Sequence, residues 1–125
     1  MHFEFHYGRR HAWEPHIDVC ERASEIVVFV EIPGVERKDI QITWNDGVLA
    51  ISGEKQTPPI TGIVRHHCIE RTQGHFRREI AINAAVDHEK ARAELRDGLM
   101  RIYLPKTGAV PKSGKIPISE QGTEL

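Results

Sequence analysis

The sequence predicts an all-β domain, and three of its features support that prediction. Residues 26–30 read Ile-Val-Val-Phe-Val, a β-branched and aromatic run that suits a buried strand. Residues 40–45 alternate apolar and polar side chains, which is the period of a half-buried strand. Asp-Gly pairs at residues 46–47 and 97–98 lie between such runs, and Asp-Gly favours the tight turn of a hairpin. Antiparallel hairpins are therefore the expected building unit.

Two strands are expected before the first of these hairpins. Residues 17–20 alternate apolar and polar side chains after Pro15, a position that suits an edge strand. The apolar run of residues 26–30 follows a polar turn and should form the next strand. Pro33 and Gly34 end it, because proline lacks a backbone donor and glycine adopts conformations that other residues avoid.

The second half of the chain is expected to form one long strand and a second hairpin. Residues 69–82 should form the long strand, with a kink at Gly74. Residues 85–95 are rich in helix formers, but their last part alternates apolar and charged side chains before an Asp-Gly turn. We therefore expect strand there, paired with residues 99–104, and Pro105 ends the domain.

Composition narrows the classes of protein that are possible. The 125 residues suit one domain, and 39% apolar with 28% charged residues is typical of a soluble globular chain. No run approaches the roughly 18 apolar residues of a membrane helix, and residues 1–10 lack the apolar core of a signal peptide. We expect a cytoplasmic location, no membrane partner and reduced cysteines at Cys20 and Cys68. The formal net charge of −1 gives no electrostatic reason to expect nucleic acid.

The sequence lacks the motifs of common enzymes, including a phosphate-binding loop, a GxSxG turn and a zinc-protease HExxH. We therefore expect neither catalysis nor a cofactor. His66, His67, Cys68 and His75 are residue types that bind zinc or copper. Adjacent residues of a strand point to opposite faces, however, so no metal site is expected.

Four blocks of sequence occur in a diagnostic order: WEPHIDVCE at 13–21, VEIPGVERKDIQITWNDGVLAISGEK at 30–55, ARAELRDGLMRIYLPK at 91–106, and IPI at 116–118. Together they resemble the α-crystallin domain of the small heat-shock proteins. The resemblance implies an immunoglobulin-like two-sheet β-sandwich of seven or eight strands with flexible terminal extensions. It divides the chain into a short N-terminal arm (1–12), an α-crystallin domain (13–107) and a C-terminal extension (108–125).

The N-terminal arm and the tail are the two extensions to which the resemblance assigns roles. It implies a client-binding arm carrying Phe3, Phe5 and Tyr7, shorter than is usual in the family; the alternative is a frayed chain end. It implies that the tail motif Ile116-Pro117-Ile118 docks in a groove of a neighbouring subunit; the alternative is a disordered tail. Proline presets an extended backbone, so docking costs little entropy. The expected groove residues are Ile40, Ile42, Trp44, Ala91, Ala93 and Leu95.

Residues 56–69 should form a long loop, because they contain Pro58, Pro59 and Gly62. Such a loop resembles that of bacterial and plant members, which implies a short strand that crosses to a partner subunit and forms the dimer by exchange. Exchange would also pair an otherwise open sheet edge. The expected exchange residues are Ile60, Ile63, Val64, Arg65, His66 and His67.

Arg78 shares one face of its strand with Phe76 and Ile80 and matches an arginine of the family. The resemblance places it at the dimer interface. A buried arginine would need a carboxylate partner; the alternative is a surface arginine with a solvated head group.

The resemblance implies an ATP-independent chaperone that holds unfolding proteins and works as dimer-based homo-oligomers. The alternative is a monomeric or dimeric co-chaperone-like recognition module with the same sandwich; the long loop and the tail motif favour self-assembly. Protonation of all eight histidines would change the net charge from −1 to +7. Histidine ordinarily titrates near pH 6.5, so we expect assembly or holding activity to differ between pH 7.5 and pH 5.5.

Overall fold

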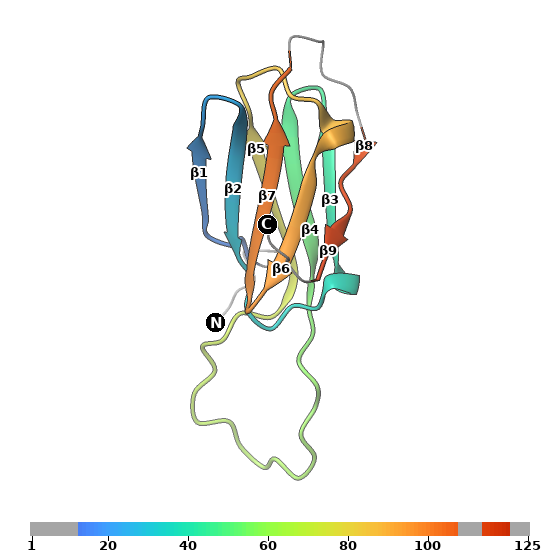
Figure 1. Cartoon of the computed structure of the whole chain (residues 1–125). Helices are drawn as coiled ribbons and strands as arrows, with labels where there is room; N and C mark the ends of the chain where they lie inside the picture. Colours follow the sequence, from blue (N-terminus) through green and yellow to red (C-terminus); the bar gives the residue numbers. More distant parts are fainter. Residues whose placement is uncertain (1–12, 108–113, 121–125) are drawn as a thin grey trace.

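The computed structural model describes residues 13–107 and 114–120, and these form two β-sheets packed face to face (Figure 1). This part of the chain contains no α-helix, only two short 3-10 turns, η2 (Arg37–Asp39) and η3 (His88–Lys90). The strands are β1 (Ile17–Glu21), β2 (Glu25–Glu31), β3 (Ile40–Asn45), β4 (Val48–Lys55), β5 (Gly74–Ala81), β6 (Arg92–Arg96), β7 (Leu99–Pro105), β8 (Gly114–Lys115) and β9 (Ile118–Ser119). The predicted all-β sandwich is confirmed.

One sheet has the strand order β1-β2-β7-β6-β9 and the other has the order β5-β4-β3-β8. Every pair is antiparallel except β6 with β9, which is parallel. The inner faces of the two sheets meet in one apolar core. Its largest fully buried side chains are Trp44, Phe76, Ile32, Ile42, Leu49, Ile51, Met100, Ile102, Leu104, Val28, Val30 and Val86.

The apolar run that predicted a buried strand forms β2, which lies between β1 and β7. Val28 is fully buried in the core, and Val27, on the opposite face, is also only 4% exposed. Burial on both faces explains why this strand lacks apolar–polar alternation.

Both Asp-Gly pairs form the hairpin turns that the sequence predicts. Asp46 and Gly47 have φ of 51° and 83°, and Asp97 and Gly98 have φ of 53° and 80°. Positive φ at both central residues is the geometry of a type I′ turn, which matches the twist of the flanking strands. The register of β3 with β4 and of β6 with β7 follows from these turns.

The prediction of one strand over residues 69–82 is wrong for its first part. β5 begins only at Gly74, whose φ of 92° interrupts an extended backbone. Trp13 marks this starting point, because its indole Nε1–H donates a 3.1 Å hydrogen bond to the Gly74 carbonyl oxygen. Residues 69–73 lie exposed beyond it with no strand beside them. The short exchange strand that the resemblance implies among residues 60–67 is likewise not formed within the single chain.

Candidate functional site: the tail groove and the open sheet edge

The tail segment of residues 114–120 runs along one side of the sandwich and joins the two sheets there. β8 pairs with β3, placing Lys115 opposite Thr43, and β9 pairs with β6, placing Ile118 opposite Ala93. Figure 1 shows β8 beside β3 and β9 beside β6. The tail thus adds a two-residue edge strand to each sheet, and it connects the two sheets on this side of the sandwich.

Ile116 lies between these two short strands and enters the core. Its backbone N–H donates a 3.0 Å hydrogen bond to the carbonyl oxygen of Ile42, and its side chain is only 3% exposed. Pro117 is exposed. Because proline has no backbone N–H, no donor is left unpaired at this position. Ile118 is half-buried and packs against the same core.

The structure brings the six expected groove residues together around this segment. Ile40 is half-buried, and the other five are between 0% and 7% exposed: Ile42, Trp44, Ala91, Ala93 and Leu95. The groove is filled by the tail of its own chain. Docking on a neighbouring subunit stays a prediction.

Two contacts at the ends of the tail segment were not foreseen from the sequence. Arg37, on η2, reaches the Ile118 carbonyl oxygen at 3.4 Å and the Glu120 carboxylate at 3.5 Å. At the other end, the His88 ring occupies the space that a side chain at Gly114 would need. Both partners lie in short turns without a periodic pattern, so no spacing in the sequence connects them with the tail.

A second candidate site is the loop of residues 56–73, which projects from one end of the sandwich (Figure 1). Every residue in it is exposed. Val64 is 99% exposed, and three other large apolar side chains are 45–72% exposed: Ile60, Ile63 and Ile69. Four exposed large apolar side chains in one loop make it a candidate interaction surface.

The strand β1 forms an open edge of the five-stranded sheet. Ile17 and Val19 lie opposite Val30 and Val28 and so face the same side as the core. Val19 is nevertheless 47% exposed. Within the described residues, no strand pairs with the outer side of β1 and Val19 stays exposed, and a further strand could cover both features.

Arg78 occupies the predicted face of β5, half-buried beside Phe76 and Ile80. A carboxylate partner was expected only for a buried arginine, and no carboxylate of the described residues forms an ion pair with Arg78. Its Nη1 instead donates a 3.1 Å hydrogen bond to the Pro15 carbonyl oxygen. A carbonyl suffices because the side chain is only partly buried, so the charge does not need a buried counter-ion. The neighbouring Arg77 points outward and pairs with Glu79.

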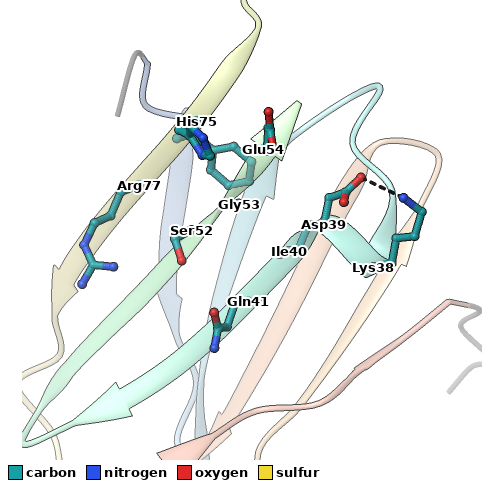
Figure 2. A pocket seen from close by; sticks show the side chains of 10 residues that line it. Lys38, Asp39, Ile40, Gln41, Ser52, Gly53, Glu54, His75 and Arg77 are labelled. Atoms are coloured by element: carbon teal, nitrogen blue, oxygen red, sulfur yellow. Dashed lines mark hydrogen bonds and ion pairs between the residues drawn. The ribbon is translucent and has the colours of Figure 1, made fainter. Parts of the chain in front are cut away.

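A third feature is an open hollow across the ends of β3, β4 and β5, shown in Figure 2. Lys38 and Asp39 form an ion pair of 3.4 Å on one side, and this contact raises the pKa of Lys38 above its usual value. Arg77 points away on the other side. These side chains do not converge on a common point, which a catalytic site would require.

Other expected groups are scattered or lie outside the described residues. In the described part, Cys20 and Cys68 are free and exposed, and no three His, Cys, Asp or Glu side chains are placed to hold a metal ion. None of its helical segments is long or apolar enough to cross a membrane. Phe3, Phe5 and Tyr7 of the arm belong to residues 1–12, which the structure does not describe.

Comparison with known proteins decides the family. The model of the Hsp20/alpha crystallin family matches residues 18–119, which include both the groove and the tail motif. The chain belongs to this family. Small heat shock protein C4 of Rickettsia felis is 33% identical over 114 residues, covering 91% of this chain and 69% of the relative. The chain spans about two thirds of the length of such relatives.

Solved structures of small heat shock proteins share the sandwich. Heat shock protein 16.0 from Schizosaccharomyces pombe superposes with a TM-score of 0.70 at 31% identity, over 83% of this chain and 73% of that one. A small heat-shock protein from Xylella fastidiosa, described as having a distinct high order structure, gives a TM-score of 0.68 at 26% identity. That match covers 90% of this chain and 96% of the Xylella protein.

Proposed function

We propose that this protein is an ATP-independent molecular chaperone that binds unfolding proteins and prevents their aggregation. The observation that carries the proposal is the apolar groove occupied by a short segment of the C-terminal tail. Ile116 is 3% exposed in a groove between two sheets, yet it belongs to a tail tied to each sheet by only two paired residues. When the tail leaves, an apolar surface opens that an extended client segment can cover.

The working unit that we propose is a homodimer formed by strand exchange. The loop of residues 56–73 carries exposed apolar side chains, and β1 is an open edge with Val19 exposed beside it. Pairing the loop of one subunit with β1 of its partner would cover both surfaces at once. Ile63 and Ile69 have the same parity along the chain, so one extended segment can turn both toward the exposed Ile17–Val19 side.

Tails then join dimers into larger homo-oligomers. A groove that accepts residues 114–120 of its own chain has the same shape for the identical segment of a neighbour. Each exchange of a tail between subunits frees a groove for a time. Client binding and assembly are therefore coupled through one surface, and no nucleotide is needed. Phe3, Phe5 and Tyr7 of the arm are proposed to add client contacts, and the cytoplasm is the proposed location.

Suppression of heat-induced aggregation of a thermolabile client, measured by light scattering without ATP, tests the proposal. We expect protection that rises with the ratio of chaperone to client. The matched control is the same mass of an inert protein. Absence of protection at a tenfold excess of the chaperone would refute the holding activity. A strictly monomeric mass would favour the co-chaperone-like recognition module instead.

A further inference from the structure

We propose that the groove recognises the seven residues 114–120 rather than the Ile-Pro-Ile motif alone, and that His88 and Arg37 determine its specificity for the chain's own tail sequence. The proposal rests on the tail docking described above and names what selects the tail. Ile-Pro-Ile reads the same in both directions, so its two apolar side chains alone fix neither the direction nor the identity of the segment. The contacts at the two ends supply both.

At the first end, the His88 ring lies against Gly114 and disfavours any side chain at position 114. A Cβ built on Gly114 would lie 2.5 Å from Nε2 and 2.6 Å from Cδ2 of the His88 ring, far inside van der Waals contact. His88 is half-buried on η3, and Asp87 caps this turn by accepting a 3.2 Å hydrogen bond from the Glu89 N–H. The ring is therefore carried on an ordered turn, and a larger residue could enter only by displacing it.

At the second end, Arg37 contacts two successive acceptors of the tail. Its guanidinium lies 3.4 Å from the Ile118 carbonyl oxygen and 3.5 Å from a carboxylate oxygen of Glu120. A guanidinium has several donors in one plane, so it can serve a carbonyl and a carboxylate together. Glu36 and Asp39 could compete with Glu120 for Arg37. Both already pair with Lys38, whose amino group lies 3.4 Å from a carboxylate oxygen of each.

The contacts at Gly114 and Glu120 together favour one direction of the tail in the groove. A segment inserted in the reverse direction would place an acidic side chain near His88 and a glycine near Arg37, and it would lose both contacts. Arg37 and Glu120 are 52% and 58% exposed, so their ion pair is weak and sensitive to salt. We therefore expect the steric contact at Gly114 to discriminate between tail sequences more strongly than the ion pair does.

Peptide binding to the full chain with an emptied groove tests this directly. The double variant Ile116→Ala, Ile118→Ala keeps its own tail out, and fluorescence anisotropy reports binding of labelled peptides of residues 114–120. We expect a Gly114→Val peptide to bind at least about tenfold more weakly than the native peptide. We expect a Glu120→Lys peptide to bind about two- to fivefold more weakly at low salt. A Lys115→Ala peptide is the matched control, because Lys115 is exposed and pairs only through its backbone.

Compensating changes in the groove separate recognition from general damage. His88→Ala should restore binding of the Gly114→Val peptide, and Arg37→Glu should reverse the preference between glutamate and lysine at position 120. Equal binding of all peptides that keep both isoleucines would overturn the role of the two ends while leaving the groove intact. Failure of the native peptide to bind, or equal binding of a peptide with both isoleucines changed to alanine, would overturn tail docking itself.

Discussion

The backbone N–H of Ile116 donates a 3.0 Å hydrogen bond to the carbonyl oxygen of Ile42, within one chain. This bond continues the pairing of β8 with β3 and directs the Ile116 side chain into the core. The segment that could join subunits therefore fills its own groove first. Under the proposed function, a neighbour's tail or a client would bind only in the fraction of chains whose own tail has left, which would lower the apparent affinity of both.

A tail that can leave should contribute less to stability than the core behind it. Ile116 and Ile102 are 3% and 0% exposed, and Ile102 lies in the middle of β7. We expect Ile102→Ala to lower the free energy of unfolding by about 2–5 kcal/mol. Ile116→Ala should lower the free energy of unfolding by less than about 2 kcal/mol, because the variant can lose no more than the free energy with which the tail docks in its groove. Urea denaturation at one fixed protein concentration compares them, and equal losses would show that the tail is a permanent part of the core.

Arg78 and Arg77 are adjacent, but only one of them should matter for stability. Arg78→Ala removes the hydrogen bond that links β5 to the Pro15 carbonyl oxygen, and we expect a loss of about 1–2 kcal/mol in the free energy of unfolding. Arg77→Ala is the control, since its exposed pair with Glu79 should contribute at most about 1 kcal/mol. Thermal melting measures both, and a larger effect at Arg77 would contradict the assignment.

The loop should control the dimer without affecting the sandwich. We expect Ile63→Ser with Ile69→Ser to raise the dimer dissociation constant at least about tenfold, because both side chains are exposed in the single chain and lie on the side that pairing would turn toward a partner. Sedimentation velocity measures the dissociation, and circular dichroism checks that the fold is kept. Thr57→Ser with Thr61→Ser, in the same loop, is the control. A dimer unchanged by the apolar substitutions would place its interface elsewhere.

Assembly should weaken as the pH falls from 7.5 to 5.5. Protonation of histidines raises the net charge from −1 toward +7, and subunits of like charge repel each other. His66 and His67 lie exposed beside Arg65 in the loop, at the proposed dimer contact. We expect a smaller mass at pH 5.5 by light scattering, and a smaller pH effect in the double variant His66→Gln, His67→Gln. The same mass at both pH values would remove the hypothesis.

The sequence predicted those parts of the fold whose cause is local. The two hairpins depend on Asp-Gly pairs that adopt positive φ, and the core strand β2 depends on its own apolar run. The start of β5 was mispredicted because it depends on a distant residue, Trp13, and on the absence of a neighbouring strand for residues 69–73. Gly74 marks the position locally, as the predicted kink, but no local pattern shows that the strand fails to form before it.

The candidate site divides in the same way. The resemblance indicated which residues line the groove and which fill it, and the structure brings them together. It could not indicate Arg37 or His88, because each acts on the tail through a contact between segments far apart in the chain. The two-residue strands β8 and β9 are also too short for any periodicity to show.

The most direct test of assembly through the tail is the molar mass of the wild-type chain and of the Ile116→Ala, Ile118→Ala double variant by multi-angle light scattering. We predict a wild-type mass well above twice the chain mass of 14.2 kDa, and a variant that falls to the dimer. A wild-type mass of one chain at every concentration, or a variant that keeps the full wild-type mass, would contradict the account.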